Sequence, residues 1–211
     1  MNKVIATLVF IIIACSVKAQ HAGYAPVKDT AVFRQQFAAA SQKINSVQSD
    51  FVQEKNLSML SEKIISKGKF WFKKENKVRM EYTQPFQYLM ILNNNNIYIK
   101  DGQKENKIST SSSKLFQQIN RIVIDCVKGS AFSNTDFRIN IFENKQTCLI
   151  ELSPVVKNLK DIFKTINVTV DKKDYSVLNI QMNEVSGDYT SINFVNKQIN
   201  ASLPDALFTA H

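Results

Sequence analysis

The side chains that most often carry out chemistry are few in this sequence and far apart. The histidines are His21 and His211, one near each end of a 211-residue chain. A serine or cysteine nucleophile needs a neighbouring base, and a metal centre needs clustered ligands. The sequence also contains no C-x-x-C pair and no glycine-rich phosphate loop. We therefore expect no enzymatic activity, no metal and no cofactor.

Two other patterns have a chemical interpretation and a simpler structural one. Glu81, Asp101 and Glu105 could serve as an acid–base pair, but isolated carboxylates in strands and turns are usually solvated. Residues 69–74, Lys-Phe-Trp-Phe-Lys-Lys, interleave basic and aromatic side chains as nucleic-acid-binding strands do. Ordinary strand alternation explains them equally well, and the net charge of +9 is spread along the whole chain. We expect no nucleic-acid partner.

The N-terminus has the features of an export signal. Lys3 precedes an apolar run over residues 4–14, and Val17 and Ala19 occupy the small-residue positions of a cleavage site. Residues 1–19 are thus expected to be a signal peptide cleaved after Ala19, which leaves residues 20–211 as one exported domain. The stretch Ile12-Ile13-Ala14-Cys15 resembles a lipobox, so a lipoprotein anchored through Cys15 is the alternative. Cys126 and Cys148 form either a disulfide or two buried thiols.

Apolar spacing predicts two amphipathic helices. Phe33, Phe37, Ala40, Ile44 and Val47 recur at steps of four and three after the capping residues Asp29 and Thr30. Leu115, Ile119, Ile122 and Cys126 form a second stripe. Each helix must place its stripe on another surface.

The rest of the chain alternates with a period of two, which predicts strands. They are expected over residues 49–55, 64–74, 78–82, 88–92, 97–99, 137–142, 148–152, 163–170, 176–182 and 190–195. Short turns such as Glu75-Asn76 and Asp101-Gly102 make the sheet antiparallel. We expect about eleven strands in a sheet that curls or closes, with the helices covering what stays open. A polar lead at 21–28 is expected to be mobile, and the tail at 200–211 is expected to pack along a sheet edge.

The meander from Gly68 to Asp101 carries more apolar surface than a small sheet needs. Its alternate positions line either a core or a cavity, and a curl of this width can hold a ligand. The cavity candidates are Phe70, Phe72, Val78, Met80, Tyr82, Met90 and Leu92. The lid candidates are Phe37, Ile44, Ile119 and Ile122, and the rim or partner candidates are Lys74 and Arg79.

The order of these motifs resembles the LolA-type outer-membrane lipoprotein carriers. The resemblance rests on Ser49-Asp50-Phe51-Val52-Gln53, on residues 68–74, and on Val78-Arg79-Met80-Glu81-Tyr82 followed by Gln84-Pro85. It covers most of the mature chain, although Lys74-Glu75 and Met80 depart from the residues usual at those places. It implies a mainly antiparallel α+β fold, an unclosed half-barrel with lid helices around an apolar cavity.

The same resemblance implies a function. Members of the family carry acylated proteins across the periplasm from an inner-membrane transporter to an outer-membrane acceptor, so acyl chains and these two partners are expected for a monomeric carrier. Two alternatives remain open at this point. One is a lipid-anchored acceptor of the LolB type, and the other is a carrier of a non-protein lipid such as a glycolipid.

Overall fold

The structure is a computed structural model that describes residues 21–94, 96–102, 104–109, 122, 125, 130 and 134–210. Its elements are β1 (Ala25–Pro26), α1 (Thr30–Lys43), β2 (Ser46–Asn56), β3 (Ile64–Lys73), β4 (Lys77–Gln84), β5 (Tyr88–Asn93), β6 (Asn96–Asp101), β7 (Lys104–Ser109), β8 (Phe137–Glu143), β9 (Thr147–Pro154), α3 (Lys157–Lys160), β10 (Phe163–Asp171), β11 (Val177–Glu184), β12 (Tyr189–Ile199) and the 3₁₀ turn η2 (Asp205–Phe208). Within these residues, no helix is both long and apolar enough to cross a membrane.

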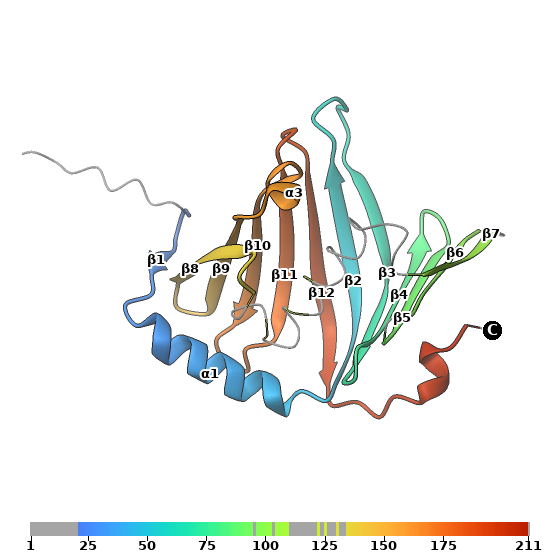
Figure 1. Ribbon diagram of the computed structural model, residues 1–211, viewed down its shortest axis with the longest axis horizontal. Coiled ribbons are helices and arrows are strands. Elements are labelled where there is room, and N and C mark those ends of the chain that lie inside the picture. Colours follow the sequence, from blue (N-terminus) through green and yellow to red (C-terminus); the bar gives the residue numbers. More distant parts are fainter. Residues whose placement is uncertain are drawn as a thin grey trace, which may run out of the picture.

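Neighbouring strands pair antiparallel in one open sheet of order β1-β8-β9-β10-β11-β12-β2-β3-β4-β5-β6-β7. Two meanders, β2–β7 and β8–β12, join where β12 pairs with β2. The sheet curls but its ends, β1 and β7, do not pair, and α1 runs across one end beneath β8–β12 (Figure 1). This confirms the predicted half-open antiparallel barrel: eleven of the strands are β2–β12, and β1 is a two-residue addition.

Helix α1 begins as predicted and ends earlier. Asp29 Oδ1 accepts hydrogen bonds from the Ala31 and Val32 amides, each at 3.0 Å, which satisfies two open helix donors. The predicted extension to Val47 is wrong, because Ile44 is already extended and Val47 belongs to β2. Asn200 Nδ2 donates to Lys43 O, and Asn200 Oδ1 accepts from the Asn45 amide. The Asn200 side chain is thus a long-range clamp: it supplies the hydrogen-bond partners that the backbone at Lys43 and Asn45 would find in a longer helix.

Local sequence explains the meander. Glu75 and Asn76 both have positive φ in the tight three-residue turn, residues 74–76, between the paired Lys73 and Lys77. Gly68 faces the ring of Phe51 across β2 and β3, and a Cβ there would lie 2.6 Å from Phe51 Cζ and 2.1 Å from Glu81 O. Glycine at 68 therefore lets β2, β3 and β4 approach closely beneath an aromatic ring.

Two segments differ from expectation near the sheet edges. Strand β7 was not predicted, because Lys-Glu-Asn-Lys-Ile-Ser has almost no apolar alternation, yet it pairs with β6 along its whole length. The lead expected to be mobile is tied down. Pro26 pairs with Phe142 in β8, and His21 Nε2 lies 2.9 Å from Glu151 Oε2.

The C-terminal tail also lies elsewhere than expected. Leu203 and Phe208 are buried against Ile91 and Tyr98, on the face of β4–β6 that points away from α1. The tail therefore covers a sheet face rather than an edge, because the apolar side chains on both faces of β5 and β6 need partners. We call this side the outer face, and the side that packs with α1 the inner face.

Candidate ligand-binding site

The inner face brings all seven predicted cavity residues together. Strand register places Phe70 beside Met80 and Met80 beside Met90, with Phe72, Val78 and Leu92 in the next row. Five of the seven are buried in the hydrophobic core: Phe70, Phe72, Val78, Met90 and Leu92. The other two, Met80 and Tyr82, are half-buried and pack against this core. The alternation of the meander thus identified one continuous apolar surface.

The predicted lid residues belong to this same cluster as far as they are described. Phe37 and Ile44 are buried in it from α1 and its C-terminal cap. Ile122 is helical and only 4% exposed, and it belongs to the cluster as well. Ile119 lies outside the described residues, as do Cys126 and the whole signal segment with Cys15. Cys148 is a buried free thiol on β9.

The two predicted rim residues are not equivalent. Lys74 Nζ donates to Gln42 O at 2.7 Å and so holds the last turn of α1. Arg79 lies on the outer face, where its guanidinium pairs with Glu81 Oε2 at 2.8 Å and donates to Leu207 O at 3.1 Å. Strand alternation thus turns Arg79 away from Met80, and its role at the rim or with a partner stays a prediction.

A crevice opens on the inner face beside the C-terminal end of α1. Its volume is about 20 Å³, and its apolar lining residues are Ile44, Val47, Phe70, Val177 and Phe194. Three polar residues, Ser49, Ser176 and Lys197, complete the lining. Phe70 and Phe194 meet edge to face with their ring centroids 5.1 Å apart, which fixes the floor. The crevice is thus an apolar pocket with a polar side.

A β-bulge places Lys197 on the inner face. Val195 pairs with Asp50 and Gln198 with Gln48, so Asn196 and Lys197 together oppose the single residue Ser49. Asn196 has a φ of +55° and turns outward, where its Nδ2 donates to Asp50 Oδ2 at 2.9 Å. The extra residue shifts the alternation by one, so the side chain of Lys197 enters the crevice.

The hydrogen-bond partners of Lys197 are a hydroxyl and a backbone carbonyl rather than a carboxylate. Its ammonium donates to Ser176 Oγ and to Val177 O, the latter at 3.1 Å. Burial lowers the pKa of Lys197, an effect that Asp174 and Asp171 in the nearby β10–β11 turn partly oppose. Within the described residues no carboxylate oxygen lies within ion-pair distance of this ammonium. Ser49 Oγ, also buried, has no hydrogen-bond partner there.

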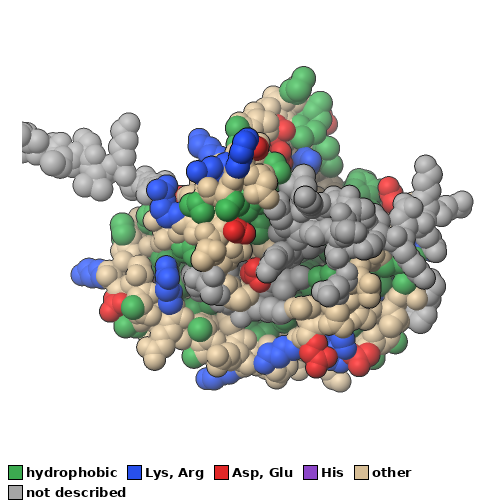
Figure 2. All heavy atoms as spheres, viewed as in Figure 1, with side chains coloured by type: hydrophobic (Ala, Val, Ile, Leu, Met, Phe, Trp, Pro, Cys, Tyr) green, Lys and Arg blue, Asp and Glu red, His purple; other side chains and the backbone are tan. Residues whose placement is uncertain are grey.

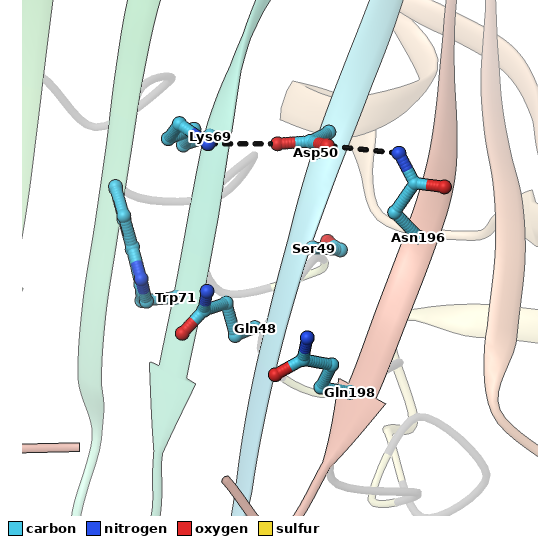
Figure 3. A pocket seen from close by; sticks show the side chains of 7 residues that line it. All are labelled: Gln48, Ser49, Asp50, Lys69, Trp71, Asn196 and Gln198. Carbon is cyan, nitrogen blue, oxygen red and sulfur yellow. Dashed lines mark hydrogen bonds and ion pairs between the residues drawn. The ribbon is translucent and has the colours of Figure 1, made fainter. Parts of the chain in front are cut away.

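The opposite face of the same strands carries a separate, polar pocket of about 220 Å³ (Figure 3). Lys69 Nζ lies 3.1 Å from Asp50 Oδ1, and Asn196 completes a chain of polar contacts over β3, β2 and β12. Trp71, Gln48 and Gln198 lie below this chain in Figure 3. Ser49 lines both pockets, so only the thickness of β2 separates the polar outer pocket from the apolar inner crevice.

Aromatic side chains gather at the other end of the meander. Tyr82 lies 4.9 Å from Phe51 and 5.6 Å from Tyr88 between ring centroids, and Phe86 stacks on it from the β4–β5 connection. The Tyr82 hydroxyl donates to Gln53 Oε1, and burial raises the pKa of Tyr82. A concavity of about 240 Å³ adjoins Tyr82 and Tyr88.

Exposed apolar side chains concentrate at this end of the half-barrel, opposite α1. Met59 is 95% exposed at the tip of the β2–β3 connection, which projects beyond the sheet. The others there are Leu60, Ile64, Ile65, Phe86, Val155 and Val185. Figure 2 shows apolar side chains at the surface of the projecting tip.

The sequence analysis missed the polar side of the crevice. Strand β12 was expected to end at Val195, which left Lys197 outside any element. A signal is nevertheless present: Ile192 and Phe194 both have even numbers, whereas the next apolar residue on the inner face, Ile199, has an odd one. Such a change of phase within one strand indicates a bulge. Ser49 carries no comparable signal, because a lone serine on a strand is ordinary.

Comparison with known proteins agrees with this geometry. A family model described as outer membrane lipoprotein carrier protein LolA matches residues 42–211. No curated protein is a significant match. MucB is similar in structure with a TM-score of 0.53 at 14% identity, over 86% of this chain and 62% of MucB. An uncharacterized conserved protein from Thermus thermophilus gives a TM-score of 0.52 at 8% identity, over 87% of this chain and 94% of that one. At such identities the two structures share the fold alone, whereas the family match spans most of the sequence: the chain belongs to the LolA family of outer membrane lipoprotein carrier proteins.

Proposed function

We propose that this chain is a periplasmic carrier that holds the acyl chains of lipoproteins against its inner face. The observation that carries the proposal is the continuous apolar surface from Phe70 to Leu92, which lies on the inner face of a sheet whose end strands do not pair. An unclosed sheet can admit a ligand between its ends, whereas a closed barrel must be entered through its mouth. The family match supports the same function.

Acyl chains provide enough binding energy for capture from water. Burying 16 carbons contributes on the order of 12 kcal/mol at about 0.8 kcal/mol per CH₂. Because such binding makes release slow, a carrier must hold the chains less well than its acceptor does. We therefore propose an inner-membrane transporter as the donor and an outer-membrane acceptor as the destination.

Helix α1 is the element that we propose moves. The crevice of about 20 Å³ is far smaller than an acyl chain, so binding requires the inner face to open. Helix α1 buries only Phe33, Phe37 and Ser41, and the buried Ser41 Oγ has no hydrogen-bond partner among the described residues. A helix with so few buried side chains is displaced more easily than a strand of the sheet. The clamp at Asn200 holds its C-terminal end and β1 holds the segment before it, so we expect the helix to be displaced between these two ties.

Binding of a fluorescent fatty acid to delipidated protein tests the proposal. Met80→Glu places a carboxylate on the half-buried inner surface, and we expect it to weaken binding by at least about tenfold while the sheet stays folded. Val195→Glu, on an exposed outer-face valine, is the matched control and should bind as the wild type does. If the wild type binds no acyl probe, the proposal is wrong. If Met80→Glu unfolds the protein, Met80 is a core residue rather than a cavity residue.

The nature of the cargo and of the anchor has separate tests. Mass spectrometry of the mature N-terminus distinguishes a free Gln20, expected for a carrier, from a diacylglyceryl Cys15, expected for an anchored acceptor. Native mass spectrometry of the protein purified from its envelope should show bound lipidated peptides or proteins. Recovery of glycolipid alone would instead identify a carrier of a non-protein lipid.

A further inference from the structure

The polar side of the inner crevice has no role in a purely apolar site. Lys197, Ser49 and Ser176 lie among Ile44, Val47, Phe70, Val177 and Phe194. An ammonium group loses hydration in such surroundings, so its retention there calls for a compensating partner. The bulge that turns Lys197 inward also departs from regular strand pairing, and bulges frequently redirect a side chain at a functional site.

Two polar residues that line the crevice, Lys197 and Ser49, keep unused hydrogen-bonding capacity. An ammonium has three donors, and protein oxygens at Ser176 and Val177 accept two hydrogen bonds from Lys197. Ser49, the residue opposite the bulge, is 2% exposed, and its hydroxyl has no partner within the described residues. One donor of Lys197 and the hydroxyl of Ser49 are therefore available to a ligand in the same crevice.

We propose that Lys197 and Ser49 form a polar anchor that binds the carbonyl or carboxylate oxygens at the head of an acyl chain, while its tail lies along the inner face. This inference rests on the proposed carrier function and specifies the ligand of that site. A ligand oxygen that bears charge pairs with the unpaired ammonium, and an ester carbonyl accepts a hydrogen bond from either group. The tail then extends from Phe70 toward Met80 and Met90, which follow it in register.

Charge around the anchor favours an oxygen ligand over a cationic one. The described carboxylates that act on Lys197 are Asp171, the last residue of β10, and Asp174 in the β10–β11 turn; neither lines the crevice. Among the residues that line the crevice, the Lys197 ammonium is therefore the group that carries a full charge. Burial lowers its pKa, so a bound carboxylate would restore the stability of the protonated form.

Three ligands with one tail test the anchor. Dodecanoate, methyl dodecanoate and dodecanol are competed against the neutral probe N-phenyl-1-naphthylamine on delipidated wild-type protein, Lys197→Met, Ser49→Ala and Lys173→Met. Lys173 is exposed in the β10–β11 turn, so its substitution removes the same charge without touching the crevice. The readout is the ratio of affinities within each protein, which cancels a general loss of stability.

We expect the wild type and Lys173→Met to bind dodecanoate about tenfold more tightly than dodecanol, as one charge-assisted hydrogen bond provides. Lys197→Met should reduce this ratio to about one, and Ser49→Ala should reduce it partly. A preference for the methyl ester over the alcohol would identify ester-linked acyl groups as ligands, and a preference for the carboxylate alone would identify free fatty acids.

The outcomes separate the two proposals. If all three ligands bind but Lys197→Met keeps the wild-type ratio, the anchor is wrong and the carrier function stands. If none of the three ligands binds the wild type and the probe does not bind either, the carrier function and the anchor are both wrong. Circular dichroism of each variant establishes that the sheet is intact before the ratios are compared.

Discussion

The two ends of the half-barrel differ in how their apolar side chains are covered. At the α1 end, Phe33 and Phe37 of the helix meet the ring of Tyr175, and Asn200 and Lys74 hold the last helical turn through backbone carbonyls. At the opposite end, Met59 is 95% exposed, and Phe86 is half-exposed although it stacks on Tyr82. Side chains of the same type are thus core at one end and surface at the other.

The difference indicates which end changes during function. A large exposed apolar surface usually marks a contact site. The covered end holds the crevice, so ligand entry there must disturb packing, whereas contact at the open end disturbs none. We infer that the covered end is the one that responds to a bound acyl chain.

The largest expected effect is on stability at the covered end. Phe37→Ala removes a ring that is 1% exposed, and we expect a loss of about 3–5 kcal/mol in the free energy of unfolding. Phe86→Ala, at the open end, should cost less than about 1 kcal/mol because that ring is half-exposed. Urea denaturation followed by the fluorescence of Trp71 measures both. Equal losses would mean that the two ends do not differ as described.

The clamp on α1 should have a smaller effect with a local signature. Asn200 has a φ of +59°, so Asn200→Gly keeps the backbone conformation and removes only the side-chain hydrogen bonds to Lys43 and Asn45. We expect a loss of about 1–2 kcal/mol. Hydrogen exchange should increase in the last turn of α1 and remain unchanged at the β2–β3 tip. Uniformly faster exchange would contradict a local clamp.

Titration of Lys197 should appear as a pH-dependent difference in stability. Because burial lowers its pKa, the folded state binds fewer protons than the unfolded state between the folded pKa and the ordinary value near 10.5. Stability contributed at this site therefore rises as pH increases through that window. Subtracting the unfolding free energy of Lys197→Met from that of the wild type isolates the effect, and the difference should grow with pH. A difference that falls with pH would contradict a desolvated ammonium.

Thiol labelling compares the two ends at single positions, with Cys148 at the covered end. Cys148 is 1% exposed, and burial raises its thiol pKa to about 11. At pH 8, in a Cys126→Ser background, iodoacetamide should therefore react with Cys148 on the order of a hundredfold more slowly than with an unfolded chain. A cysteine introduced by Val185→Cys at the exposed end should react at the unfolded rate. Fast labelling of Cys148 would mean that the covered end opens freely without ligand.

Much of this architecture follows from the residue pattern. Alternation over Phe70–Leu92 identified the inner face, and the helical stripe with Asp29 identified where α1 begins. The end of α1 was missed because it depends on Asn200, a residue 157 positions away from Lys43. Strand β7 was missed because its sequence has almost no apolar alternation, whereas its backbone pairs with β6 along its whole length. Long-range partners of this kind leave little trace in local sequence.

The candidate site was predicted in the same uneven way. Its apolar wall was visible, because strand alternation assigns each residue to a face. The polar residues Lys197 and Ser49 were not predicted, because the bulge at Asn196 moves the residues that follow it to the opposite face. Arg79 was assigned to the rim, and the structure places its guanidinium beside Glu81 and Leu207 on the outer face; its role with a partner stays a prediction.

The most direct test of the central claim is photocrosslinking with a fatty acid that carries a diazirine in its tail. Peptide mass spectrometry then locates the attachment sites on the delipidated, reloaded protein. We predict crosslinks to inner-face residues such as Phe70, Met80 and Met90, and their loss when unlabelled fatty acid competes. Crosslinks confined to the outer face, at residues such as Trp71 and Leu203, or to the exposed tip around Met59, would contradict an acyl-binding inner face.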